Sequence, residues 1–242
     1  MRFLSSRYTC RVTAEHPTGS PPAGTTHTAY PPGLADQAAE TIRQRLIAGE
    51  LVPGQQLSEA ALSDDLAISR NTLREAFRAL TYEGLLTHQH HRGVFVVVPT
   101  IASIIDIYRV RRIIECQALT QALPKHPAGE RMRTASAEAL RLRDAGDWVG
   151  VGTANMEFHS AIVSLADSQR LDALYANVSA ELRLAFSLLD DPEFLHGPYV
   201  DLNTTIDTLY AEGRTAEAGV ALNDYLLQSE RTVLAAYTRH GA

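Results

Sequence analysis

Two side chains with a clear capacity for chemistry, Asn155 and His159, lie four residues apart in the stretch NMEFHSAIVSLA. On a helix, this spacing places both on one face. An imidazole beside an amide could form part of a metal site or hydrogen-bond a small molecule. The pair could equally pack in a core, where buried polar groups also find partners. The choice depends on what else the fold brings to this face.

A second set of candidate residues is a row of arginines. Arg70, Arg74 and Arg78 recur every four residues, and Asn71 and Thr72 stand beside the first of them. On a helix with its apolar face turned inward, these residues would lie on an outer face. Guanidinium, amide and hydroxyl groups placed in this way reach phosphates and base edges in the DNA major groove. The alternative is a solvated helix face with no ligand.

The overall charge restricts the nucleic-acid interpretation. The chain of 242 residues has 22 Lys and Arg against 28 Asp and Glu, for a formal charge of −6, so indiscriminate coating of nucleic acid is not expected. Residues 34–98 hold six arginines and eight acidic residues, a net charge of −2 (6 − 8). DNA binding must therefore rest on local placement. Lys125 is the only lysine, and arginine suits bidentate recognition, although genomic base composition explains the same bias.

No segment predicts a membrane or secreted protein. No apolar run approaches the roughly 20 residues that a membrane helix needs, and the N-terminus lacks the apolar segment of a secretion signal. Cys10 and Cys116 have neither CxxC nor zinc-type spacing. We therefore expect a cytoplasmic protein without membrane contact.

The elements that position the arginines follow from periodicity and from helix caps. Residues 1–33 are rich in Pro, Gly, Ser and Thr, which predicts a disordered extension or an incorrectly assigned start. A first helix then has Leu34, Ala38, Ile42 and Leu46 on one face and ends at Gly49.

Two further helices should begin after Ser58 and Ser69, each a residue that caps helices well. The third helix would bury Leu73, Ala76, Phe77 and Leu80 and expose the arginines. Two short strands, LLTH and VFVVV, follow it. Helix, helix, tight turn, helix and hairpin is the order of a winged helix-turn-helix, which we place at residues 34–99.

The rest of the chain, residues 103–242, shows no strand pattern. Pro and Gly residues separate six helical stretches, which are 103–123, 128–145, 147–167, 169–190, 199–212 and 214–239. Short loops between them predict an antiparallel bundle. The predicted fold class is thus mainly α, an N-terminal winged helix-turn-helix followed by an all-α antiparallel helical bundle, with His196 in a loop.

The stretch from Gly49 to Val98 resembles the DNA-binding domain of the GntR family of bacterial transcription regulators. It shares the patterns PG..LSE..L, SR.TLREA...L..EGL and a final RG.FV, in order and without gaps. The resemblance implies a homodimeric regulator, with repression the expected mode, that binds a palindromic operator in double-stranded DNA. Family members often have arginine after LSE, whereas Ala60 stands there in this chain, so the half-site sequence is less predictable.

The resemblance also implies which residues contact DNA. Arg70 and Arg74 would be the main operator contacts, supported by Asn71 and Thr72. The wing tip near the minor groove would consist of His90 or His91, with Arg92 and Gly93.

The helical region resembles the effector domain of the FadR-like branch of the same family, the FCD domain, in its shorter six-helix version. The matching stretches are DIYRVRRIIECQAL, AGDWVGVGTANMEFHSAI and YAEGRTAEAGVALNDYLLQSER. Many such domains hold a divalent metal through one aspartate and three histidines, with a small carboxylate effector at or near it. At those positions this chain has Asn155, His159, Asn203 and Tyr225.

This set is poor in metal ligands. Asparagine and tyrosine coordinate cations weakly, no anionic side chain remains among the four, and a competent Zn, Ni or Mn site needs three or four good ligands. We therefore expect no cofactor, and a neutral polar pocket for a small organic acid. Three roles stay open for His159: a core residue hydrogen-bonded to Asn155 or Tyr225, a donor to an effector, or a lone metal ligand.

Arg111 has two possible roles. It could face the pocket and pair with an effector carboxylate, or it could pair with Glu115 at i+4 on the surface; Arg183 is a further candidate for the first role. Catalysis is not expected, because a nucleophile motif, a phosphate loop and a complete metal set are all lacking. The alternative to effector sensing is a DNA-binding dimer whose C-terminal domain serves mainly for dimerisation.

Overall fold

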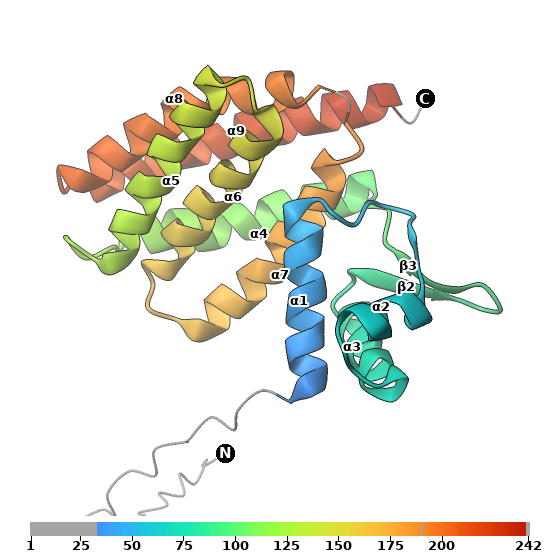
Figure 1. Ribbon diagram of the computed structural model, residues 1–242. Helices are drawn as coiled ribbons and strands as arrows, with labels where there is room; N and C mark the ends of the chain where they lie inside the picture. Colours follow the sequence, from blue (N-terminus) through green and yellow to red (C-terminus); the bar gives the residue numbers. More distant parts are fainter. Residues whose placement is uncertain (1–32, 190, 241–242) are drawn as a thin grey trace, which may run out of the picture. The chain divides into compact units, whose positions relative to one another are not determined.

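The computed structural model describes residues 33–189 and 191–240, which belong to one compact unit (Figure 1). The predicted N-terminal extension lies outside the described residues except for Gly33. The elements, in chain order, are α1 (Leu34–Ala48), β1 (Gln56–Leu57), α2 (Glu59–Asp65), α3 (Arg70–Tyr82), β2 (Leu86–Gln89), β3 (Gly93–Val96), α4 (Ile101–Thr120), α5 (Pro127–Asp144), α6 (Trp148–Ser164), α7 (Gln169–Phe186), α8 (Pro192–Ala211) and α9 (Thr215–His240).

The N-terminal region is a winged helix-turn-helix, which confirms the predicted fold class. Ser58 and Ser69 cap α2 and α3, accepting hydrogen bonds from backbone N–H groups three residues on, at 3.3 and 3.1 Å. Gly49 ends α1 with a φ of 80°, a value that favours glycine. The strands form an antiparallel sheet in the order β1-β3-β2. The two residues of β1 were not predicted, because so short a strand carries no periodic signal.

The apolar cluster of this region forms as the periodicity predicts, with one exception. The predicted inner face of α3 is buried, and it packs with the buried face of α1. Leu34 is 64% exposed, because it is the first residue of α1 and lies one turn before the buried part of the helix. The same cluster includes Ala180 and Leu184, which belong to α7. One helix of the C-terminal region therefore completes the core of the N-terminal region.

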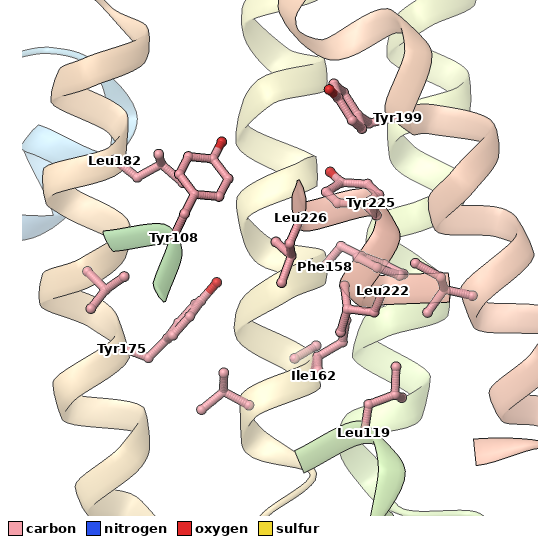
Figure 2. Packing of buried hydrophobic residues seen from close by; sticks show 14 of the residues in the cluster. Tyr108, Leu119, Phe158, Ile162, Tyr175, Leu182, Tyr199, Leu222, Tyr225 and Leu226 are labelled. Carbon is pink, nitrogen blue, oxygen red and sulfur yellow. The ribbon is translucent and has the colours of Figure 1, made fainter. Parts of the chain in front are cut away.

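The C-terminal region is the predicted helical bundle. Helix α4 packs along α9, and α6 lies in contact with α4, α5, α7 and α8. Figure 2 shows Phe158 and Ile162 of α6 close to Leu222 and Leu226 of α9 in a buried cluster. The functional candidates on α6 are therefore carried by a central helix of the bundle.

Helix α8 begins at Pro192, seven residues before the predicted start at 199, so the prediction was wrong there. The pair Gly197 and Pro198 looked like a helix breaker. Proline costs one backbone hydrogen bond inside a helix, but burial of the neighbouring Leu195 and Tyr199 in the core offsets that cost. His196 consequently lies in a helix and is 4% exposed, and its predicted loop position is wrong.

The other C-terminal helices agree with prediction to within a few residues, except that α7 ends at Phe186 instead of 190. Within the residues that the structure describes, no helix is both long and apolar enough to span a bilayer.

Candidate nucleic-acid interface and effector site

The outer face of α3 presents three of the predicted DNA-contacting residues. Arg70, Asn71 and Arg74 are exposed, and the buried face of the helix fixes their direction. Arg74 donates from Nε to Glu59 Oε2 at 2.9 Å. The Arg70 side chain, in contrast, has no hydrogen bond or ion pair to any other described residue. One guanidinium is therefore free to bind a ligand, and the other is held by an exchangeable surface pair.

Thr72 lies differently from its predicted partners. It is half-buried, and its hydroxyl is 2.8 Å from Ser69 Oγ, the group that caps α3. Its side chain therefore rigidifies the start of the helix. The N-terminal end of α3 also favours an anion through the helix dipole, so phosphate could approach beside Arg70.

The wing tip is a tight turn between β2 and β3. His90 and Arg92 are exposed, and Gly93 adopts a φ of 101°, which side chains other than glycine rarely tolerate. Gln56 of β1 donates from Nε2 to the Arg92 carbonyl at 2.6 Å. The Arg92 guanidinium lies 5.5 Å from the Phe95 ring centroid. Gly93 can therefore offer only backbone to a ligand, while Arg92 and His90 offer side chains.

The four residues predicted for the bundle pocket meet in its core. Asn155 Oδ1 accepts hydrogen bonds from Asn203 Nδ2 at 2.7 Å and from the Tyr225 hydroxyl at 2.9 Å. The ring of His159 lies 4.9 Å from that of Tyr225. All four are at most 8% exposed. Helices α6, α8 and α9 thus bring together residues separated by up to 70 positions.

The hydrogen-bond partner of His159 is neither Asn155 nor Tyr225, the two partners considered for a histidine that packs in the core. Its Nδ1 lies 2.7 Å from Glu115 Oε2, and Asn155 and Tyr225 do not bond to its ring. Arg111 Nε donates to Glu115 Oε1 at 2.7 Å. The second of the two roles considered for Arg111, pairing with Glu115, is present, but the pair lies in the core instead of on the surface, with side-chain exposures of 3% and 0%.

A fourth side chain completes this buried ionic cluster. The Tyr175 hydroxyl donates to Glu115 Oε1 at 2.6 Å, and Figure 2 shows Tyr175 reaching inward from α7. The core therefore holds a buried carboxylate, and the prediction of a pocket without an anionic side chain was wrong. Glu115 and Tyr175 were missed as site residues. The sequence signal for Glu115 was its position four residues after Arg111, which predicts the pair but neither its burial nor its contact with His159.

The charges of the cluster determine the state of His159. Burial favours a raised pKa for Glu115, but the charge of Arg111 and hydrogen bonds from His159 and Tyr175 bring that pKa down to about 2. Burial lowers the pKa of His159, and the nearby Arg111 lowers it further, against the effect of Glu115. Because Glu115 is ionised, Nδ1 of the neutral imidazole must carry the hydrogen. Nε2 is then a hydrogen-bond acceptor.

Two buried polar atoms of this core lack a hydrogen-bond partner among the described residues, namely His159 Nε2 and Asn203 Oδ1. Both are acceptors. An unsatisfied buried acceptor costs about 1–3 kcal/mol. Two acceptor atoms of this core are therefore buried without a hydrogen-bond donor among the described residues.

The divalent metal that many such bundles hold does not fit these residues. In the described part of the chain, no group of three or more His, Cys, Asp or Glu side chains could hold a metal ion. Asn155 Oδ1 already accepts two hydrogen bonds, and burial raises the pKa of the Tyr225 hydroxyl. Only His159 Nε2 remains as a ligand of the usual kind.

Arg183, the further candidate for a carboxylate partner, lies at another place. It is 6% exposed, its guanidinium faces Gly49 at the end of α1, and Nη2 donates to the Ala48 carbonyl at 3.5 Å. A cation at a helix C-terminus is favourable. Arg183 thus joins the two regions, and no hydrogen bond links it to the cluster around Glu115.

Comparisons with known proteins agree with both regions. Residues 34–96 match the family described as "Bacterial regulatory proteins, gntR family", and residues 106–226 match the FCD domain. A solved structure described as a "putative transcriptional regulator GntR from Rhodococcus sp. RHA1" is 40% identical. The match spans 84% of this chain and 98% of the Rhodococcus chain, with a TM-score of 0.77.

Two relatives of known sequence are also transcription regulators. The "Nta operon transcriptional regulator" of Aminobacter aminovorans is 29% identical over 55% of this chain, and the match spans 64% of that relative's length. The "Probable D-xylose utilization operon transcriptional repressor" of Paenarthrobacter nicotinovorans is 28% identical over 74% of this chain and 82% of the relative. The chain therefore belongs to the GntR family and carries an FCD domain: it is a DNA-binding transcriptional regulator and not an enzyme.

Proposed function

We propose that this regulator binds a palindromic operator as a homodimer and represses transcription from it in the cytoplasm. The observation that carries the DNA-reading part is the outward face of α3. Arg70, Asn71 and Arg74 stand on a capped helix whose opposite face is locked in a core. An exposed row of this kind suits phosphate and base-edge contacts in a major groove. Arg92 and His90 at the wing tip would add contacts beside it.

Exposed apolar side chains support the homodimer. Ile113 on α4 is 73% exposed, and Val220 on α9 is 64% exposed. These two helices pack along each other, so a second copy that covered them would remove both aliphatic side chains from water, which is favourable. An Ile113→Asp variant should shift the protein toward monomer in sedimentation equilibrium.

The operator contacts can be tested by substitution. An operator is first selected from a random DNA library by repeated binding and sequencing. Arg70→Ala and Arg74→Ala should each weaken its binding by about 1–3 kcal/mol, measured by fluorescence anisotropy. Arg133→Ala, an exposed arginine on α5, is the matched control and should bind normally. Wild-type affinity in both α3 variants would refute the assignment.

We further propose that the bundle core binds a small organic effector through His159 and Asn203, lined by Asn155 and Tyr225. The two unpartnered acceptors support this, because each lacks a donor that a ligand could supply. Arg111 already holds the carboxylate of Glu115, so an effector carboxylate would have to compete with the protein's own. Hydroxyl and amine groups suit the core better than the acid expected from the sequence.

The sensing role has its own experiment. The full chain is screened by thermal shift against hydroxylated metabolites, amines, small carboxylates and divalent metals, and each hit is tested for its effect on operator affinity. His159→Phe and Asn203→Leu remove one acceptor each and should abolish the response while leaving basal operator affinity unchanged. If no compound raises the melting temperature or changes operator affinity, the bundle is mainly a dimerisation module.

A further inference from the structure

A separate cavity of about 500 Å³ lies where α1 of the N-terminal region, the winged helix-turn-helix, meets α5, α6 and α7. This volume is within the range of small-molecule sites. Gln44 and Ile47 of α1 form one wall, and residues of the bundle form the others. Gln44 and Thr153 are exposed, so the cavity is open to solvent. The cluster of Asn155, Asn203 and Tyr225 does not line it.

The cavity wall is one hydrogen bond from the buried ionic cluster. Tyr175 lines the cavity, and its hydroxyl donates to Glu115 at 2.6 Å. Glu115 in turn holds His159 and Arg111. A molecule in the cavity would therefore contact both α1 of the N-terminal region and Tyr175, whose hydroxyl is bound in the bundle core.

The polar groups of the wall are already connected to one another. Arg131 donates to Glu157 Oε1 at 2.7 Å and to Ser164 Oγ at 3.2 Å. Ser164 donates its hydroxyl hydrogen to Asp172 Oδ1 at 2.9 Å. Asp172 forms no ion pair with any residue that the structure describes. One guanidinium thus faces two carboxylates, so the wall has an excess of acceptors and a formal charge of −1.

The negative charge and the excess of acceptors in the cavity wall indicate which ligands would bind there. A negative wall disfavours carboxylates and phosphates, while carboxylate, hydroxyl and amide oxygens accept hydrogen bonds from hydroxyl groups. Ile47, Met156 and Tyr175 supply apolar surface beside these acceptors. We propose that the cavity between α1 and the bundle binds a neutral, polyhydroxylated molecule of monosaccharide size. This site is additional to the proposed effector core.

The position of the cavity gives the ligand a route to the operator. The α1 helix, which carries Gln44 and Ile47, packs against the recognition helix α3. A ligand that contacts α1 and α7 together stabilises one arrangement of the two regions over others. Operator affinity should then change by about fivefold or more on binding.

The test uses the full chain with myo-inositol and D-glucose as neutral probes and D-gluconate as the acidic comparison. Binding is followed by methyl NMR of Ile47, Met156 and Ala176, and operator affinity by anisotropy. We expect both polyols to shift these resonances at millimolar concentration and gluconate to bind at least about tenfold more weakly. No shift with either polyol, or equal binding of gluconate, would overturn the proposal.

Matched variants locate the site. Ala176→Trp on α7 fills the cavity and should abolish the response, whereas Leu174→Trp, two residues away and exposed, should retain it. Gln44→Leu and its neighbour Thr41→Leu, both exposed on α1, give a second pair that leaves the bundle core untouched. Retained polyol binding in Ala176→Trp and Gln44→Leu would refute the site.

The same probes distinguish this site from the proposed effector core. A polyol response that survives His159→Phe but not Ala176→Trp supports the cavity, whatever the core binds. A response that survives Ala176→Trp but not His159→Phe places the polyol in the core, which supports the effector proposal and overturns this one.

Discussion

Two arginine–glutamate pairs, one on the DNA-reading face and one in the bundle core, use the same chemical groups in opposite surroundings. Arg74 and Glu59 are 2.9 Å apart with side-chain exposures of 55% and 35%. Arg111 and Glu115 are 2.7 Å apart with exposures of 3% and 0%. Water competes with the first pair and is excluded from the second. The exposed pair can therefore exchange its carboxylate for a DNA phosphate, whereas the buried pair must stay closed.

The energetic consequence differs accordingly. An exposed ion pair contributes about 0–1 kcal/mol. A buried pair has paid its desolvation cost on folding, and loss of one partner leaves an uncompensated charge in the core. The same substitution should thus act on operator binding in one region and on folding in the other.

The largest expected effect comes from opening the buried pair. Glu115→Ala strands Arg111 and removes the partner of His159, so the free energy of unfolding should fall by about 3–5 kcal/mol, measured by urea denaturation. Glu138→Gln, which breaks an exposed pair with Arg141, should have no measurable effect. In a second comparison, Glu115→Leu is combined with Arg111→Met. If the double variant is more stable than Glu115→Leu alone, the stranded charge of Arg111 causes the loss. An unchanged unfolding midpoint for Glu115→Ala would remove the energetic contrast between the two pairs.

Acid should lower the free energy of unfolding through buried groups of the bundle, more than through groups on the exposed face of α3. Burial and the charge of Arg183 lower the pKa of His196 from 6.5 to about 4. The unfolded chain therefore binds this proton at higher pH than the folded one. The stability that the neutral, buried His196 contributes is fully present above pH 6.5. It declines by about 3 kcal/mol as the pH falls toward 4.

The measurement is the unfolding free energy as a function of pH. His196→Gln should reduce the slope of the curve between pH 6.5 and 4, while His88→Gln, a substitution of an exposed residue, should leave the slope unchanged. The lowered pKa of His159 acts in the same direction. A wild-type curve that is flat over this range would contradict a buried, neutral His196.

The smallest effect should come from the exposed pair. Glu59→Gln releases Arg74 and removes a negative charge near the DNA, so operator affinity should rise by less than about 1 kcal/mol, with unchanged thermal stability. The measurement is fluorescence anisotropy on the selected operator. A loss of affinity would mean that Glu59 positions Arg74 for binding and does not compete with phosphate.

The sequence patterns were sufficient for the fold and for the outer face of α3, because both depend on local rules. Helix caps at Ser58 and Ser69 and the apolar period of α3 act within a few residues of chain. The start of α8 could not be predicted in this way. Its Pro198 is tolerated because of tertiary burial, which no local rule contains.

The core site was predicted only in part. Family resemblance located Asn155, Asn203 and Tyr225, and the structure brings these together. It could not indicate that Glu115 would turn inward and take His159 as its partner, because that depends on how α4 packs against α6. Tyr175 is 60 residues from Glu115, and one tyrosine in an amphipathic helix carries no signal of such a contact.

The presence of Ala180 and Leu184 in the apolar cluster of α1 and α3 bears on the modularity of this regulator. Grafting a foreign DNA-reading region onto this bundle would confront α7 with an unmatched surface. Conversely, residues 34–99 expressed alone would leave the face of α1 that meets α7 open to water. A chimera that swaps operator specificity should therefore exchange the contact face of α7 together with the winged helix, or confine the swap to the outer residues of α3.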